Sequence, residues 1–257
     1  MTRAADLPVN LLAVMAVAAM WPQCFSFSQV SPQSVHYISS SAMGDFLFGT
    51  GKRVEEQDSY LTLNVNNKSA CRVACWTHPN CASAGSTSNG DGAVQCRLAE
   101  AIPSFIEIAD DPNATLSFWP EKSKIGKYEI REDGLLYLQS AWKAKLTDVQ
   151  KWCGNLPGHR LPTIKTPSHL LAVKTYMEQT GRKPWVDLKL KDGILVWGDD
   201  TPFDNSTVAS SLTVLPHDNG NPNAIYYFMK STSSVKADTM GSFHHTLCQA
   251  NPLGVDW

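Results

Sequence analysis

The stretch Trp185–Asp204, WVDLKLKDGILVWGDDTPFD, decides the fold of the second half of the chain. It holds two short apolar runs, Trp185–Leu188 and Ile194–Trp197, on either side of Asp192-Gly193. An Asp-Gly pair between two β-prone runs favours a hairpin, because the tight turn needs a positive φ that this pair adopts at little cost. A hairpin with one apolar face is not stable alone in water. We therefore expect elements before and after this stretch to cover that face.

The composition excludes several classes of partner. The chain has 257 residues, a formal net charge of −2 and no block of basic residues. This charge pattern argues against nucleic acid or an anionic membrane as a partner. The apolar content and the many Trp, Gly and Pro residues are typical of a globular protein rather than a disordered one. The length allows one large domain or two small ones.

Residues 1–26 have the pattern of a secretory signal peptide. Arg3 gives the positive charge, Leu7–Trp21 is a short apolar core, and the segment from Cys24 to Ser26 offers small residues for cleavage. The apolar run is short for a transmembrane helix, so an N-terminal membrane anchor is the weaker alternative. We expect a secreted, extracellular protein without a membrane anchor.

The cysteines support this location and indicate two domains. Cleavage after Ser26 removes Cys24 and leaves six cysteines, which can all pair in an oxidising compartment. Four of them lie within Cys71–Cys96, and the other two lie far apart at Cys153 and Cys248. With the boundary in a polar stretch after Pro120, the predicted organisation is a signal peptide at 1–26, one domain at 27–123 and a second at 124–257.

Three sequons predict a glycoprotein. Asn67, Asn113 and Asn205 each begin an Asn-x-Ser/Thr triplet. Such triplets are compatible with glycosylation on surface loops.

The first domain is predicted to contain a short helix near its cysteines. Ser69 is a candidate N-cap for this helix. Cys71 and Cys75 are four residues apart and therefore lie on one helical face. Short strands are expected at Phe46–Phe48, Tyr60–Leu63 and Val94–Leu98.

The pattern C-x3-C-x5-C-x14-C-x-L, from Cys71 to Leu98, resembles the PAN/apple family. The resemblance implies a helix clamped onto a sheet by two disulfides, Cys71–Cys96 and Cys75–Cys81. The third bridge of many apple domains has no cysteines here, so the similarity is to the shorter PAN core. The alternatives are another small disulfide-braced module and a zinc site, which an oxidising compartment disfavours.

The second domain begins with strands and a first helix. Thr147 is a candidate N-cap for a helix that ends at Cys153, with Val149 and Trp152 on its buried side. Strands are expected at Tyr128–Ile130, Leu135–Leu138, Ala224–Met229 and Thr246–Gln249.

A second helix and a long loop flank the hairpin. Thr166 or Ser168 caps a helix over His169–Gln179, which Gly181 ends. Residues 205–223 have little periodicity and many turn-forming residues. A loop of this length in a compact domain is usually functional.

These elements, in this order, resemble a C-type lectin-like domain over residues 127–249. The resemblance implies an α+β fold with two helices flanking antiparallel sheets, a long loop and the bridge Cys153–Cys248. The second, inner disulfide of the family has no counterpart here. The matching segments are Trp152-Cys153, Arg160–Thr166, Trp185–Leu188, Val196–Phe203 and Leu247–Gln249.

The same resemblance implies where a calcium site would lie. Sugar-binding members hold Ca²⁺ with a Glu-Pro-Asn or Gln-Pro-Asp triplet, a further Glu and a terminal Asn-Asp pair. Here the triplet is Asn-Pro-Asn at 221–223, Met229 stands near the further Glu, and Asp238 alone remains of the pair. Because Ca²⁺ prefers several carboxylate oxygens, we expect a degenerate site. The candidate ligands for Ca²⁺ and sugar are Asn221, Asn223 and Asp238.

Other candidate sites are weaker. His244 and His245 with Asp238 suggest zinc, but adjacent strand residues point to opposite faces. Asp199 and Asp200 follow a strand directly and are expected to be turn residues rather than an acid–base pair. No nucleophile motif is present, so an enzyme is not expected.

The sequence thus predicts a secreted recognition protein. The leading hypothesis is binding of carbohydrate or a glycoconjugate, including recognition of microbial surfaces in innate immunity. The alternative is an extracellular protein-interaction or adhesion module that keeps the fold and does not use Ca²⁺. The response to Ca²⁺ separates the two hypotheses.

Overall fold

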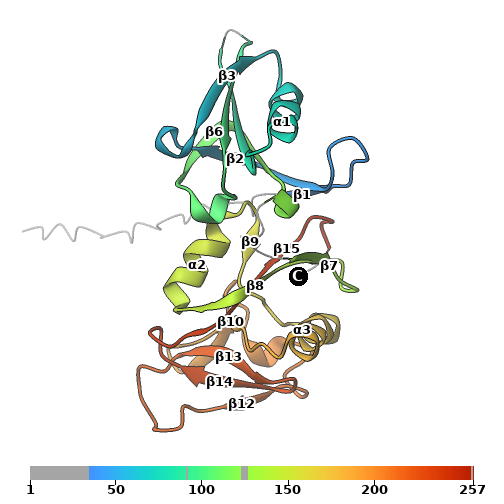
Figure 1. The fold of residues 1–257 in the computed structure, drawn as a ribbon. Coiled ribbons are helices and arrows are strands. Elements are labelled where there is room, and N and C mark those ends of the chain that lie inside the picture. The colour runs from blue at the N-terminus through green and yellow to red at the C-terminus, as the bar shows by residue number, and fades with distance from the viewer. Residues whose placement is uncertain (1–34, 91, 123–126, 256) are drawn as a thin grey trace, which may run out of the picture. The chain divides into compact units, whose positions relative to one another are not determined.

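The computed structural model describes residues 35–90, 92–122, 127–255 and 257 (Figure 1). The predicted signal peptide at 1–26 lies outside the described residues, and so does the predicted domain boundary between residues 123 and 124. Among the described residues, no helix has the length and apolar character needed to cross a membrane.

The N-terminal half is built on one antiparallel sheet of six strands, in the order β1-β2-β6-β4-β5-β3. Its longest pairing joins β2 to β6. In chain order its strands are β1 (Val35–Ile38), β2 (Phe46–Val54), β3 (Leu61–Val65), β4 (Ser83–Ser88), β5 (Val94–Ala99) and β6 (Ile108–Phe118). Three short 3-10 turns lie in this half, at η1 (Glu56–Asp58), η2 (Pro103–Phe105) and η3 (Pro120–Lys122).

The helix α1 (Lys68–Thr77) packs on β4 and β5. Its N-cap is Asn67, whose side chain accepts a hydrogen bond from the Ala70 backbone N–H. The predicted cap Ser69 is wrong, because the helix begins one residue before it. Two disulfides hold α1 in place, and they join the pairs that the PAN/apple resemblance implies: Cys71–Cys96 to β5 and Cys75–Cys81 to the chain entering β4.

The C-terminal half contains two sheets. A four-stranded sheet has the order β7-β8-β15-β9, and a five-stranded sheet has the order β11-β10-β13-β14-β12. The strands are β7 (Lys127–Ile130), β8 (Leu136–Ala144), β9 (His159–Arg160), β10 (Trp185–Lys191), β11 (Ile194–Trp197), β12 (Thr213–Leu215), β13 (Tyr226–Ser231), β14 (Ser234–Asp238) and β15 (His244–Ala250). Every pairing is antiparallel except that of β12 with β14.

The predicted hairpin is confirmed. β10 and β11 pair through the turn Asp192-Gly193, whose φ angles are 51° and 80°. Both hairpin tryptophans, Trp185 and Trp197, are fully buried. Trp197 packs in a core with Tyr176, while Trp185 belongs to a second core and donates from Nε1 to the Ala144 carbonyl at 3.1 Å.

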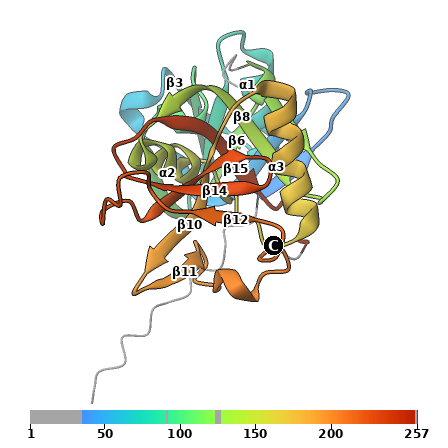
Figure 2. The same cartoon turned by 90° about the horizontal axis from the view of Figure 1, so that it is seen from below.

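Two helices, α2 (Leu146–Asn155) and α3 (Pro167–Thr180), lie on either side of β8 and β15 (Figures 1 and 2). Thr166, one of the two predicted caps, is the N-cap of α3, and its hydroxyl accepts from the His169 N–H. Gly181 ends the helix with φ 67°, as predicted, while the helix itself begins at Pro167, two residues before the predicted His169. α2 begins at Leu146, one residue before the predicted cap Thr147, and Lys145 takes the N-cap position.

The long loop is partly ordered into secondary structure. The 3-10 turn η4 (Phe203–Asn205) overlaps its start, and β12 lies within it.

The disulfide Cys153–Cys248 joins α2 to β15, as the lectin-like resemblance implies. The α+β class with disulfide-braced helices and largely antiparallel sheets is therefore confirmed.

The described residues belong to one compact unit. One hydrophobic cluster contains Leu47 and Phe118 from the N-terminal half together with Leu138 and Trp152 from the C-terminal half. This shared core fixes α2 against η2, which matters for the cleft described below.

Candidate functional site

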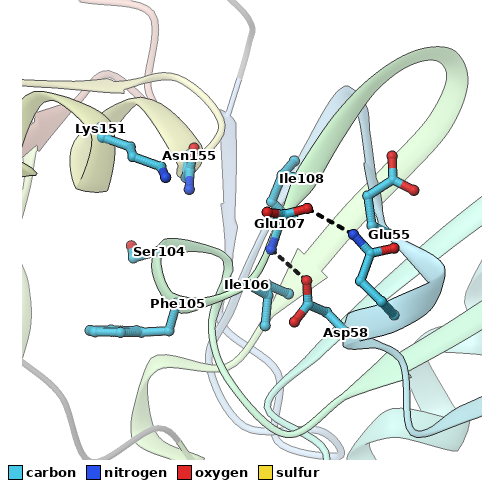
Figure 3. A pocket seen from close by; sticks show the side chains of 10 residues that line it. Glu55, Asp58, Ser104, Phe105, Ile106, Glu107, Ile108, Lys151 and Asn155 are labelled. Carbon is cyan, nitrogen blue, oxygen red and sulfur yellow. Dashed lines mark hydrogen bonds between the residues drawn. The ribbon is translucent and has the colours of Figure 1, made fainter.

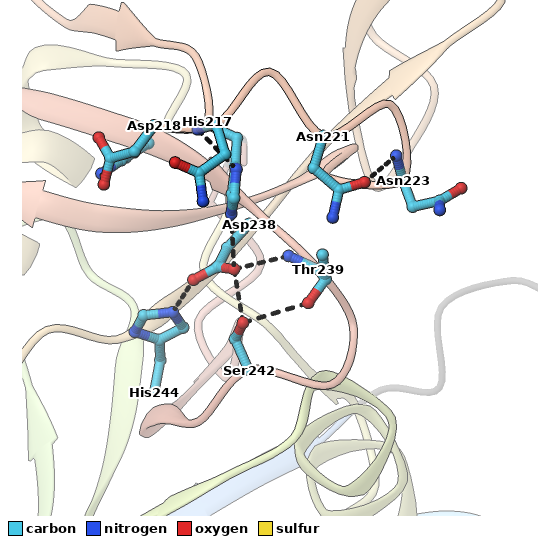
Figure 4. A network of polar contacts seen from close by, with 10 residues as sticks. His217, Asp218, Asn221, Asn223, Asp238, Thr239, Ser242 and His244 are labelled. Atoms are coloured by element: carbon cyan, nitrogen blue, oxygen red, sulfur yellow. Dashed lines mark hydrogen bonds and ion pairs between the residues drawn. The ribbon is translucent and has the colours of Figure 1, made fainter.

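The predicted calcium ligands lie at the end of the five-stranded sheet (Figure 4). Asn221 and Asn223 form a turn before β13, in which the Asn223 N–H donates to the Asn221 Oδ1 at 2.9 Å. Asp238 ends β14. Among the described residues no hydrogen bond joins either asparagine to Asp238, and no group of three or more His, Cys, Asp or Glu side chains is placed to hold a metal ion.

The Asp238 carboxylate is occupied by groups of its own loop. Its Oδ1 accepts from the Ser242 hydroxyl at 2.5 Å and from the Thr239 N–H at 2.7 Å, and its Oδ2 accepts from His244 Nε2 at 2.9 Å. Burial raises the pKa of Asp238, but the hydrogen bonds from Ser242 and His244 outweigh burial and lower the pKa overall. The carboxylate is thus held as an anion that organises the turn 239–243, and a calcium site here stays a prediction.

The two histidines face different surroundings, as expected for neighbours on a strand. The His244 ring stacks on Phe228, with centroids 3.7 Å apart, and meets the edge of Trp185 at 4.5 Å. His245 Nδ1 instead accepts from the Lys183 N–H at 3.1 Å.

A cleft lies between α2 and the N-terminal sheet (Figure 3). Its volume is about 630 Å³. One wall comes from the chain around η1 and from the start of β6, and the other from η2 and α2. The lining side chains are those of Glu55, Gln57, Asp58, Ser104, Phe105, Ile106, Glu107, Ile108, Lys151 and Asn155.

The acidic wall is fixed by hydrogen bonds within the N-terminal half. The Glu107 N–H donates to Asp58 Oδ2 at 2.8 Å, and Gln57 Nε2 donates to Glu107 Oε2 at 2.7 Å. Across the cleft, Lys151 and Asn155 project from α2 (Figure 3). The cleft therefore presents carboxylate acceptors on one side, and an ammonium and an amide on the other.

An aromatic surface borders the cleft on the α2 side. The Phe105 ring is 43% exposed and lies 5.4 Å from the Trp142 ring and 6.2 Å from the Trp152 ring. The Ser104 hydroxyl donates to the Trp152 carbonyl at 3.1 Å, which ties η2 to α2. Trp152 itself is buried, as predicted.

Sequence reasoning missed this cleft. Its lining comes from three separate segments, and none of them contains a recognisable motif. The one local signal was Phe105 in a short apolar run between two polar stretches. Phe105 alone does not predict which distant segments line the cleft beside it.

The predicted glycosylation sites are exposed. Asn67, Asn113 and Asn205 all have exposed side chains, although Asn67 also serves as the cap of α1. Asp199 and Asp200 lie in the turn after β11, and each pairs with a lysine, Lys165 or Lys191.

No protein-family model and no curated protein matches this chain. Solved structures similar to about half of it are C-type lectin domains. The carbohydrate-recognition domain of the mouse scavenger receptor C-type lectin is 13% identical, with a TM-score of 0.39, over 50% of this chain and 97% of that chain. The Kupffer cell C-type lectin receptor Clec4f is 17% identical, with a TM-score of 0.40, over 51% and 85%. The lectin CEL-I from Cucumaria echinata is 14% identical, with a TM-score of 0.38, over 48% and 93%. The comparisons do not support the PAN/apple resemblance of the N-terminal half.

Proposed function

We propose that this chain is a lectin-like recognition protein that binds carbohydrate in the cleft beside Phe105, without Ca²⁺. The observation that carries the proposal is the composition of that cleft, in which an exposed aromatic ring borders carboxylate, amide and ammonium groups. Ligand sites commonly combine an apolar surface with a few placed polar groups. A sugar matches this set, because its C–H face packs on an aromatic ring while its hydroxyls donate to carboxylates and accept from Lys and Asn.

The state of Asp238 supports independence from Ca²⁺. Calcium requires six to eight oxygen ligands, and the Asp238 oxygens already accept three hydrogen bonds from Ser242, Thr239 and His244. Bringing Asp238 to a cation would leave the partly buried His244 without its partner. The energy of that rearrangement opposes cation binding.

We propose that the cleft binds a ligand without catalysing a reaction. Asp58 and Glu107 both accept hydrogen bonds that hold their own loops together. The Ser242 hydroxyl donates to Asp238 and not to the His244 imidazole, so these three residues lack the contact that activates a serine nucleophile. We therefore propose recognition, not catalysis.

The proposal includes an extracellular location. Three disulfides and three exposed sequons support it, because disulfides form and persist in oxidising compartments. The signal peptide and a role in recognising microbial surfaces belong to the same proposal. So does the PAN/apple-like character of the N-terminal half, which its two disulfide pairings support.

A glycan array probed with the full chain, with Ca²⁺ and with a chelator, tests this function. We expect binding to uncharged glycans that is the same in both conditions. Phe105→Ala should weaken it about fivefold, since an aromatic contact contributes roughly 1 kcal/mol. Asn155→Ala should weaken it by a similar factor.

The matched control is Phe243→Ala, because Phe243 is also exposed, at 58%, but lies away from the cleft. This variant should bind uncharged glycans as the natural chain does. Loss of binding with chelator would contradict the Ca²⁺-independent mode. An array without signal, together with capture of an extracellular protein that Phe105→Ala abolishes, would favour the protein-interaction alternative. Release of reducing sugar would contradict the absence of catalysis.

A further inference from the structure

A row of basic side chains lies across the paired strands β8 and β15 of the four-stranded sheet. Lys143 on β8 lies directly opposite His245 on β15. His245 in turn borders Lys183, since the His245 N–H donates to the Lys183 carbonyl at 3.0 Å and the Lys183 N–H donates back to His245 Nδ1 at 3.1 Å. Lys145 stands two residues after Lys143, on the same side of an extended segment. We call Lys143, Lys145, Arg182, Lys183 and His245 the basic row.

The positive charge of the basic row is not neutralised within the chain. Among the described residues, none of its five members has a carboxylate within 4.0 Å, whereas Lys52, Lys165, Lys191 and Lys236 all do. Arg182 donates instead to the Ser140 carbonyl, at 3.1 Å. The three lysines Lys143, Lys145 and Lys183 are exposed.

The carboxylates on adjoining elements do not cancel the row. Asp148 lies in the first turn of α2 and, within the described part of the chain, forms no ion pair with the basic row. Asp238 accepts hydrogen bonds from Ser242, Thr239 and His244 instead. Burial lowers the pKa of His245, and the Lys143 charge lowers it further. Burial is the larger cause, and the effect of Lys143 reflects the positive charge next to the ring.

An exposed aromatic ring stands at one end of the row. Phe243 and Met240, in the turn between β14 and β15, are 58% and 38% exposed. The Lys145 Nζ lies 5.8 Å from the centre of the Phe243 ring, and the Leu146 N–H donates to the Met240 carbonyl at 3.2 Å. The hydrogen bonds to Asp238 hold the same turn from inside. Phe243 is therefore presented in a fixed position beside the lysines.

We propose that the basic row and Phe243 form a binding surface for a sulfated polysaccharide. Sulfate esters stay ionised at physiological pH and attract lysine ammonium groups, while a sugar ring packs on the Phe243 face. Neighbouring segments in a sheet lie about 4.8 Å apart. A row across three of them is therefore linear, which suits a linear polyanion better than a planar membrane. The chain carries a net charge of −2, so the attraction is a property of this surface and not of the whole protein.

This surface is separate from the cleft of the proposed function. Lys145 precedes the first residue of α2, whereas Lys151 and Asn155, which line the cleft, lie in its second half. At 1.5 Å per residue, Lys145 and Asn155 are about 15 Å apart along the helix axis. Either site can therefore fail without the other.

Binding of the full chain to immobilised heparin, measured over a range of salt, tests the proposal. The natural chain should bind, with an affinity that falls as salt rises. The double variant Lys143→Glu with Lys183→Glu should lose at least tenfold in affinity, and the salt dependence should drop by about two released counterions. Phe243→Ser should lose several-fold in affinity with an unchanged salt dependence.

The control is the double variant Lys174→Glu with Lys230→Glu, which changes the net charge equally on α3 and β13 and should bind heparin within twofold of the natural chain. Thermal unfolding shows whether each variant is folded. The surface is refuted if the natural chain ignores heparin at physiological salt, or if both double variants lose affinity equally. Binding to phosphatidylglycerol vesicles without binding to heparin would also overturn it, in favour of a lipid surface. Binding of uncharged glycans should not change in Lys143→Glu with Lys183→Glu, which separates this result from a failure of the cleft.

Discussion

At the scale of single residues, a close contact explains one glycine of the hairpin. A side chain built on Gly198 would place its Cβ 1.7 Å from the Asp187 Oδ2. Asp187 lies on β10, and burial raises the pKa of its carboxyl group. The Asp187 carboxylate therefore leaves no room for a side chain at residue 198, directly after β11.

This contact predicts coupled effects of two substitutions. Gly198→Ala should destabilise the fold by about 1–3 kcal/mol, because the added methyl group forces Asp187 out of its position. In an Asp187→Ala background the same change should cost less, since the clashing carboxylate is gone. Urea unfolding of the four members of this double-mutant cycle measures the coupling. If the effects of the two substitutions are additive, the contact with Asp187 is not the reason for a glycine at position 198.

His159 predicts part of the pH dependence of stability. Burial lowers its pKa from the ordinary value of 6.5 to about 4, although a hydrogen bond to the Pro157 carbonyl opposes the shift. Between these two values the unfolded chain takes up a proton that the folded chain does not, so stability is lost as pH falls below 6.5. From pH 7 to pH 5 the loss due to His159 should be about 2 kcal/mol.

His159→Asn tests this effect, because the Asn amide can still donate to the Pro157 carbonyl. The variant should lose about 2 kcal/mol less stability between pH 7 and pH 5 than the natural chain, as measured by urea unfolding at both pH values. His36→Asn, at an exposed position, serves as the control and should leave the pH dependence unchanged. An unaltered pH dependence in His159→Asn would exclude His159 as its source.

At the scale of elements, a buried amide joins three segments of the C-terminal half. Gln249 on β15 accepts from the Thr163 N–H at 3.0 Å and donates to the Tyr137 hydroxyl at 2.9 Å. That hydroxyl donates to Asp133 Oδ2 at 2.6 Å. The chain of hydrogen bonds ties β8, β15 and the segment before α3 into one layer.

Removing that amide should be costly. Gln249→Leu leaves the buried Thr163 N–H without its acceptor, and an unsatisfied buried group costs about 1–3 kcal/mol. We expect a loss of that size in the free energy of unfolding. Gln150→Leu, on the exposed side of α2, should change it by less than about 0.5 kcal/mol. Equal effects of the two variants would contradict a special role of the network.

At the scale of the whole molecule, the disulfides close loops of very different length. Cys75 and Cys81 are 6 residues apart in sequence, and Cys153 and Cys248 are 95 apart. In the chain-entropy model, removing the disulfide that closes the short loop lowers the free energy of unfolding by about 2 kcal/mol. Removing the disulfide that closes the long loop lowers it by about 4.7 kcal/mol. Paired Cys→Ser variants of each bridge, compared by chemical unfolding, should show this order. The reverse order would mean that packing around α1, rather than loop length, sets the contribution.

The response of the whole fold to calcium is a further prediction. A ligand at 100 times its Kd stabilises a folded protein by about 2.7 kcal/mol. Because Asp238 is held by its own loop, we expect neither millimolar Ca²⁺ nor chelator to shift the unfolding temperature. A Mg²⁺ titration controls for ionic strength. A calcium-specific increase in unfolding temperature that Asp238→Asn abolishes would restore the calcium site predicted from the sequence.

The sequence by itself determined the elements whose causes are local or patterned. Asp192-Gly193 sets the hairpin turn, Thr166 and Gly181 bound α3, and the three disulfide pairings are those that the two family resemblances implied. Local signals placed the helix starts less well, since Asn67 and Lys145 take the cap positions expected at Ser69 and Thr147. The Asn67 side chain accepts from a free helix N–H as Ser69 was expected to do, whereas no side chain caps α2 at Lys145, so no local cap signal marks the start of that helix.

Only the tertiary structure decided the surfaces that could recognise a ligand. The cleft gathers three separate segments around Phe105, and the basic row brings Lys143, Lys183 and His245 together from three others. The absence of a basic block in the sequence argued against nucleic acid or an anionic membrane as a partner, yet strand pairing brings basic side chains together across β8 and β15. The physical reason is that turns and helix caps depend on neighbours in sequence, whereas a binding surface depends on which distant side chains the shared core and the long disulfide bring to one place.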